Sequence, residues 1–267
     1  MMTARRLTGL LWWRPNIAGL LTMAACGLAW ELTIQAGIFD FQYLPAPSAV
    51  IRGAGELVTS GELAAATVHT LQSVFLGWAI AVTAGVSGGL LLGFSPLLRR
   101  YSLATIEILR PMPAIAFVPV ALLLFGFSIQ TELMVIVLPS LWPVLINTMG
   151  GVMGVHARLG EVGRTFRLSR AAIIYKVFLP AATPAIVVGV RISLTLAVVL
   201  AVLAEMVGNP EGLGYGVVSQ QQALRPDLMF AYVIVIGLLG LTLNALLVGA
   251  VSVSFPAASA ELRGSRS

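Results

Sequence analysis

Residues 212–216 read Gly-Leu-Gly-Tyr-Gly, and glycine-rich segments of this kind can hold phosphate groups. A nucleotide-binding loop also needs a strand before it and a Lys-Ser or Lys-Thr pair after it, and this segment has neither. The P-loop pattern is absent from the rest of the sequence as well. We therefore expect the chain to bind no ATP itself, and residues 212–216 to form a turn or a re-entrant gate.

The other residues with catalytic or metal-binding potential are scattered. His69 and His156 lack companions at ligand spacing, so each is expected to be a polar residue at a helix end. Cys26 is the only cysteine, which leaves no disulfide pair and no zinc cluster. Ser, Glu and His form no recognisable catalytic set. We expect no enzyme, cofactor or metal, while an intramembrane lipid-modifying enzyme and a membrane scaffold stay open as alternatives.

A few charged residues lie in or near apolar stretches. A charge at the centre of a bilayer costs about 2.5–3.5 kcal/mol, so such residues usually face the interior of a helix bundle. Glu107 and Arg110 are three residues apart and are expected near the cytoplasmic interface. Arg191 either snorkels or lines a cavity that attracts an anion, so it is a candidate pathway residue. Glu31 and Glu205 also lie in or near apolar stretches, so the same cost favours a position facing the bundle interior.

Composition explains why a bilayer is the expected solvent. Of the 267 residues, 58% are hydrophobic and 10% charged, whereas a soluble domain carries about 25% charged residues. Mean hydropathy is +0.95. The net charge of +5 comes from basic residues between apolar segments rather than from a basic stripe, so no nucleic-acid partner is expected.

The apolar stretches predict an all-α polytopic membrane protein with about six transmembrane helices. The first stretch exceeds the 7–15 residues of a signal-peptide core, so it is interpreted as a retained helix. A cytoplasmic segment 1–16 and a cytoplasmic tail 256–267 are expected to flank a transmembrane domain, 17–255. The six expected spans are 17–39, 63–98 (partly along or beyond the interface), 103–125, 133–155, 184–207 and 228–253.

Basic residues predict the orientation, because they collect on the cytoplasmic side of bacterial membranes. Only Arg52 and Arg225 fall on the opposite side if six helices alternate. Both termini are therefore expected in the cytoplasm. The twelve residues on the cytoplasmic side are Arg5, Arg6, Arg14, Arg99, Arg100, Arg158, Arg164, Arg167, Arg170, Lys176, Arg263 and Arg266.

Prolines are expected to break two of the spans, since proline removes a backbone hydrogen bond and kinks a helix. Either these breaks line the transport path or the prolines are ordinary transmembrane residues. Pro111 and Pro113 are the candidates for the path. The full set is Pro111, Pro113, Pro119, Pro139 and Pro143.

The segment 155–180 is predicted to form two short amphipathic helices on the cytoplasmic side. One interpretation is an amphipathic loop that rests on anionic lipid headgroups. Ser169 is placed to cap the second helix. Leu179 and Pro180 precede the fifth span, and proline suits a first helical turn. Apolar and charged side chains alternate along it: Leu159, Val162, Phe166, Ile173 and Ile174 among Arg158, Glu161, Arg164, Arg167 and Arg170.

Residues 161–180 resemble the EAA loop of binding-protein-dependent ABC importer permeases. That pattern is Glu-Ala-Ala, three residues, Gly, nine residues, then Ile-x-Leu-Pro. Glu161 and the Leu179-Pro180 pair match it, while Arg167 stands where the family has glycine. The likeness extends along the chain to the nitrate, sulfonate and taurine branch, on segments 44–48 (Leu-Pro-Ala-Pro-Ser), 93–100, 109–113 (Leu-Arg-Pro-Met-Pro), 147–148 and 204–215.

The resemblance implies a type I importer fold and a coupling helix, within about 156–180, that docks into a separate ATPase subunit. Leu179 and Pro180 would shape the loop. Implied partners are that ATPase, a periplasmic or lipid-anchored solute-binding protein and a second permease copy, in the inner membrane. A small, anionic, sulfonate-, nitrate- or taurine-like solute is the implied cargo. The contact candidates are Glu161, Gly163, Arg164, Thr165 and Ser169.

Overall fold

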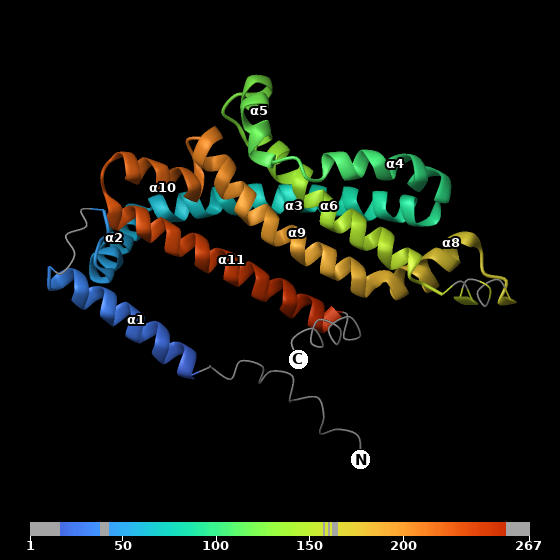
Figure 1. Ribbon diagram of the computed structural model, residues 1–267, viewed down its shortest axis with the longest axis horizontal. Coiled ribbons are helices and arrows are strands. Elements are labelled where there is room, and N and C mark those ends of the chain that lie inside the picture. Colours follow the sequence, from blue (N-terminus) through green and yellow to red (C-terminus); the bar gives the residue numbers. More distant parts are fainter. Residues whose placement is uncertain (1–16, 38–42, 157, 160, 162–164, 255–267) are drawn as a thin grey trace, which may run out of the picture.

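The computed structural model describes residues 17–37, 43–156, 158–159, 161 and 165–254 (Figure 1). Every regular element in those ranges is helical, as predicted. A 3-10 turn, Ala114–Phe117, and a π-helical turn, Ile174–Phe178, join some of the helices. The α-helices are α1 (Ile17–Gln35), α2 (Pro47–Ser60), α3 (Glu62–Phe94), α4 (Pro96–Leu109), α5 (Val118–Phe125), α6 (Ile129–Met153), α8 (Arg170–Ile173), α9 (Leu179–Gly208), α10 (Gly212–Gln222) and α11 (Pro226–Ser254).

The core is built on α6, which packs against α3 on one side and α9 on the other. Glycines allow these helices to approach closely. A Cβ atom added at Gly89 of α3 would lie 2.5 Å from the Cβ of Thr148, and one at Gly189 of α9 would lie 2.7 Å from the carbonyl oxygen of Pro143. Small residues at such contacts are how transmembrane helices gain packing without a hydrophobic driving force.

These contacts also fix the helix directions. Gly77 faces Ile136 and Gly89 faces Thr148, so positions rise together and α3 runs parallel to α6. The chain between two parallel spans must cross the bilayer in the other direction. That crossing is made by α4 and the segment Ala114–Phe125, which are bent by 87° at their junction. Among the described residues, five helices are long and apolar enough to span a membrane, and this broken pair is the sixth crossing.

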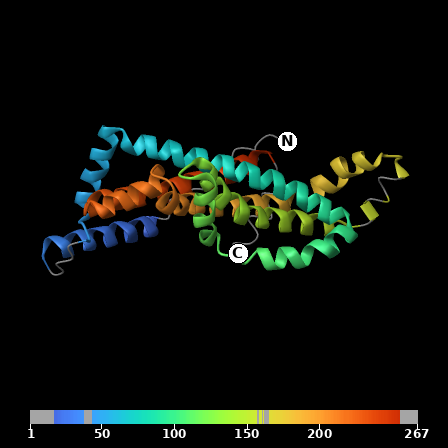
Figure 2. The same ribbon diagram turned by 90° about the horizontal axis from the view of Figure 1, so that it is seen from above.

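The two ends of the bundle carry different short elements. Figure 1 and Figure 2 both show α2 at one end, together with α10 in Figure 1, and α8 at the opposite end. At the α8 end the rings of Phe94 and Phe178 meet edge to face, with 5.3 Å between centroids. Arg99 caps the same end of α3 by donating to the carbonyl oxygens of Leu92 and Gly93. The bundle therefore has two unlike ends. One is the α8 end, which carries Arg99 and is called the basic end, and the other holds α2 and α10.

The structure agrees with the six predicted spans, including the expectation that the second is longer than a bilayer needs, and differs in three details. The 33 residues of α3 form one helix, about 50 Å long, so part of it extends beyond a hydrocarbon core of about 30 Å. The prediction that Pro139 and Pro143 break the fourth span is wrong, because both lie inside continuous α6. Two segments expected as outer loops contain helices, α2 and α10.

Candidate transport path and coupling segment

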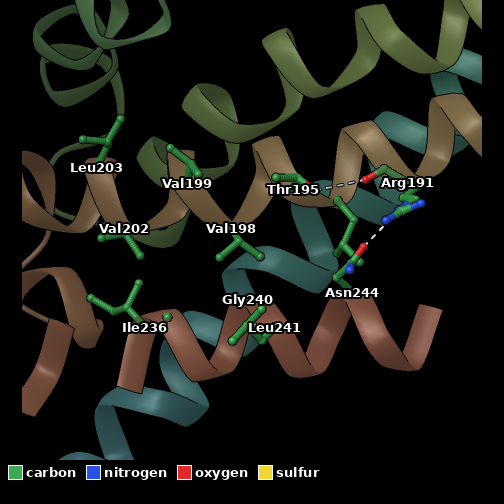
Figure 3. Close-up of a pocket in the computed structure, with 12 residues that line it drawn as sticks. Arg191, Thr195, Val198, Val199, Val202, Leu203, Ile236, Gly240, Leu241 and Asn244 are labelled. Carbon is green, nitrogen blue, oxygen red and sulfur yellow. Dashed lines mark hydrogen bonds between the residues drawn. The ribbon is translucent and has the colours of Figure 1, made fainter. Parts of the chain in front are cut away.

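A cleft of about 620 Å³ lies between α9 and α11. Its walls are mainly valine, leucine and isoleucine side chains. On α11, Gly237 and Gly240 have no side chains to fill the space. Figure 3 shows Arg191 and Asn244 pointing toward each other across one end of it. The Nε–H of Arg191 donates to Oδ1 of Asn244 at 3.1 Å. The cleft is therefore apolar along its length and carries one cation and one amide at its end.

Arg191 has no carboxylate partner in the part of the chain that the structure describes. It sits in the interior of α9, 12 residues after Leu179 and 17 before Gly208. A charge at such a depth is costly, and a single amide neighbour leaves most of the guanidinium N–H groups free to bind something else. The structure thus matches the prediction that Arg191 lines a cavity.

The predicted break at Pro111 and Pro113 is confirmed. Helix α4 ends at Leu109, and the chain turns by 87° before the 3-10 turn begins. Proline cannot donate a backbone hydrogen bond, so Pro111 and Pro113 leave the helix without two donors, which accounts for the stop. Arg110 itself still has helical φ and ψ. A second cavity, of about 460 Å³, lies at this break and is lined by Glu107, Arg110 and Pro111 opposite α6.

The predicted coupling segment projects from the end of α6. Ser169 caps α8, because its Oγ accepts from the backbone N–H of Ala172 at 3.2 Å. Arg167 has a φ of +54°, so it occupies the left-handed region that favours glycine. This is the position at which the resembling pattern carries glycine, and the turn is made here by arginine instead. Gly163 and Arg164 lie outside the described residues.

The described part of the coupling segment presents a mixed surface. Phe166 is 74% exposed, Leu159 and Tyr175 are also exposed, and Glu161 lies among them. The hydroxyl of Thr165 donates to the carbonyl oxygen of Glu161 at 3.1 Å, which is a helical contact. Exposed aromatic and aliphatic side chains beside charges are typical of a surface that is covered by a partner.

Leu179 and Pro180 open α9 directly after the π-helical turn. Residues 171–208 form one continuous span, so Pro180 follows helical residues and has no N–H to donate to the turn before it. The π-helical turn Ile174–Phe178 lies at this point, and the loop-shaping role of Leu179 and Pro180 stays a prediction.

A buried polar cluster, which sequence spacing missed, joins α3, α6 and the α9–α10 connection at the other end of the bundle. Nε2 of His69 lies 2.9 Å from Oε1 of Glu132, and its Nδ1 lies 2.9 Å from Oε2 of Glu211. The hydroxyl of Ser73 and the amide of Asn209 both donate to the carboxylate of Glu132. Three segments of the chain are tied together here.

Glu205 of α9 extends this cluster. It is 1% exposed, and its Oε2 accepts from the backbone N–H of Gly214 at 2.8 Å. Gly212 has a φ of +90°, and a Cβ atom there would lie 2.3 Å from the carboxyl carbon of Glu205. Only glycine allows the backbone to close over the carboxylate in this way. The glycine-rich segment is thus the start of α10, where the N–H of Gly214 donates to Glu205 and the N–H of Leu213 donates to the hydroxyl of Thr70.

Comparison with known proteins gives consistent matches. Residues 81–258 match the family described as binding-protein-dependent transport system inner membrane component. The chain is 33% identical over 222 residues to SsuC of Bacillus subtilis strain 168, a protein named for aliphatic sulfonates transport. The aligned region covers 83% of this chain and 80% of that protein. It is 33% identical over 177 residues to the nitrate import permease protein NrtB of Leptolyngbya laminosa, covering 66% and 63%.

The fold has a solved counterpart. A chain of the MetNI methionine ABC transporter, in inward-facing conformations, superposes with a TM-score of 0.56 at 19% identity. The match covers 71% of this chain and 97% of that one. At this identity the likeness establishes the arrangement of helices.

Proposed function

This chain belongs to the family of binding-protein-dependent transport inner membrane components and is the permease subunit of an ABC importer; on that premise we propose that it admits a small anionic solute of the sulfonate, nitrate or taurine kind. The observation that carries the choice of an anion is Arg191, a cation deep in α9 without a carboxylate partner among the described residues. The relatives are transport proteins, so the alternative of a lipid-modifying enzyme has no support.

The cleft supports the same solute class. Its guanidinium and the amide of Asn244 offer N–H donors that suit the oxygens of a sulfonate or nitrate. Its apolar walls, drawn in Figure 3, suit a short aliphatic chain. An anion would also neutralise the charge of Arg191, which otherwise costs about 2.5–3.5 kcal/mol at the bilayer centre.

The basic end of the bundle is proposed to face the cytoplasm, with both termini on that side. Segment 156–180 then docks into an ATPase subunit, with Glu161, Thr165 and Ser169 at the contact and Phe166 buried by the partner. Gly163 and Arg164 belong to the same proposal. A periplasmic or lipid-anchored binding protein would meet the end that holds α2 and α10. A second copy of the permease completes the path.

Reversing one charge tests the docking. Glu161→Lys is expected to lower co-purification of the ATPase at least tenfold and to abolish uptake, while the permease stays in the membrane. Glu62→Lys is the matched control for ATPase capture, since Glu62 is also exposed but lies at the first residue of α3, at the end opposite the proposed ATPase contact. Normal uptake and normal ATPase capture by the Glu161→Lys variant would remove the coupling role.

A second experiment tests the anion. Arg191→Gln is expected to reduce uptake of an aliphatic sulfonate or nitrate more than tenfold in proteoliposomes that contain the ATPase and the binding protein encoded nearby. Thr195→Val changes the same cleft and removes the hydroxyl that donates to the backbone carbonyl oxygen of Arg191, but it leaves the guanidinium in place, so it should transport normally. Co-purification of the ATPase should be unchanged in both variants. Wild-type uptake by Arg191→Gln would show that the cleft does not select the anion.

A further inference from the structure

Three side chains of metal-binding type meet at the end of the bundle that holds α10. His69 of α3, Glu132 of α6 and Glu205 of α9 each place one ligand atom within 4.8 Å of the others. The two carboxylates are 0% and 1% exposed, and the side chain of His69 is 15% exposed. Two acids so close together, away from water, need positive charge between them.

Each of the three side chains is held from behind by another group. Glu211 faces Nδ1 of His69 at 2.9 Å, and a proton on Nδ1 donated to Glu211 would leave Nε2 for the centre. Ser73 donates to Oε2 of Glu132, and the N–H of Gly214 donates to Oε2 of Glu205. Outer groups that fix the ring tautomer and the carboxylates in this way accompany metal ligands in most sites.

The atoms left over point to a missing cation. Oε1 of Glu205 is buried and has no hydrogen-bond partner within the described residues, although the hydroxyl of Thr70 lies near the same carboxylate. A buried carboxyl oxygen without a hydrogen-bond partner costs about 1–3 kcal/mol, and more where the group is ionised. Nε2 of His69 and Oε1 of Glu132 lie 2.9 Å apart beside it.

We propose that His69, Glu132 and Glu205 form a binding site for a divalent metal ion of the zinc class. One imidazole nitrogen and two carboxylate oxygens suit Zn²⁺, which takes nitrogen and oxygen ligands at about 2.0–2.2 Å in a tetrahedron. Mg²⁺ and Ca²⁺ prefer oxygen alone. The amide of Asn209 lies 3.2 Å from Nε2; turning it would give up its hydrogen bond to Glu132 and offer Oδ1 as the fourth ligand.

An open route leads to this site. A cleft of about 480 Å³ is lined by His69, Glu211 and Gly212 together with Tyr215 of α10. An ion entering through it meets the imidazole first and the two buried acids behind. Once bound, it joins α3, α6 and α9 at a single point and holds this end of the bundle closed.

Metal binding is tested on the full-length permease, purified with a chelator and placed in lipid nanodiscs. Titration calorimetry and elemental analysis with Zn²⁺ alone should give one ion per chain. Glu205→Gln and His69→Gln are each expected to weaken binding at least about 100-fold, and Glu211→Gln by about 10–100-fold, the usual effect of losing an outer group. Glu56→Gln, an exposed acid of α2 at the same end that does not line this cleft, should bind as the wild type does.

Two readouts keep the outcome independent of folding. A monodisperse peak in size-exclusion chromatography confirms that each variant is folded. If Glu205→Gln aggregates, the conclusion is drawn from His69→Gln. Co²⁺ in place of Zn²⁺ should give the visible absorption of a tetrahedral site in the wild type and lose it in His69→Gln. The proposal falls if the wild type binds no Zn²⁺, or if both variants bind it with wild-type affinity.

Discussion

Replacing Gly89 with alanine tests the packing of the three-helix core. The added Cβ atom would lie 2.5 Å from the Cβ of Thr148 and 2.7 Å from the carbonyl oxygen of Leu145. The second contact is with backbone, which no rotamer change relieves. Helices α3 and α6 would have to separate locally, and overpacking of this kind costs about 1–3 kcal/mol.

The expected result is a lower thermal midpoint for the purified permease in detergent. For chains of 150–250 residues, 1 kcal/mol corresponds to about 2–4 °C. Gly249→Ala is the control, because the same methyl group on α11 meets no atom within 4 Å. There the gain in helix propensity, about 1 kcal/mol in soluble helices, is unopposed, so the midpoint should stay equal or rise.

The sign of the difference between the two variants is what the packing argument predicts. If Gly89→Ala melts at the same temperature as Gly249→Ala, then α3 and α6 are not in close contact at this position. The parallel register of these helices, and the return crossing deduced from it, would then be wrong as well.

Two smaller predictions concern the ends of the bundle. Arg167→Gly should relieve the left-handed backbone at +54° and stabilise the turn before α8 by about 1 kcal/mol, seen as slower hydrogen exchange there, whereas Arg167→Val should speed the exchange. Arg225 pairs with Glu56 and Asp227 at 2.9 and 3.0 Å on the surface, and these hydrogen bonds raise its pKa, so it stays charged at every working pH. Arg225→Gln should therefore leave the thermal midpoint nearly unchanged at physiological salt, with no new pH dependence, since exposed pairs are screened.

The spans and the break at Pro111 and Pro113 were predictable because both follow from local composition. Hydropathy alone locates a span, and two prolines around one residue stop a helix. Pro139 and Pro143 misled the same reasoning, since α3 and α9 pack along both sides of α6 and hold it continuous. What a proline does in a membrane thus depends on neighbours that the local sequence does not show.

The two short outer helices differ in how visible they were. Helix α2 has Pro47 in its first turn and Gly61 after its last, with a φ of +81°, which are recognisable start and stop signals. Helix α10 has no capping side chain and few apolar residues, so only its packing reveals it. The polar cluster was out of reach, because His69, Glu132 and Asn209 are 63 and 77 residues apart and share no local pattern.

The close contacts in the core bear on how force would cross this subunit. Backbone-level packing at Gly89 and Gly189 makes α3, α6 and α9 a unit that resists bending, since dense interiors transmit displacement instead of absorbing it. If the proposed docking of segment 156–180 moves the start of α9, the whole unit must tilt with it. The polar cluster at the far end then moves together with these three helices. The chain can accommodate the tilt at the 87° break after α4, because helical hydrogen bonding is already interrupted there. Helix breaks are where element-terminal residues take up such rotations. The break is therefore the expected hinge, and α3, α6 and α9 are expected to rotate about it as a rigid unit.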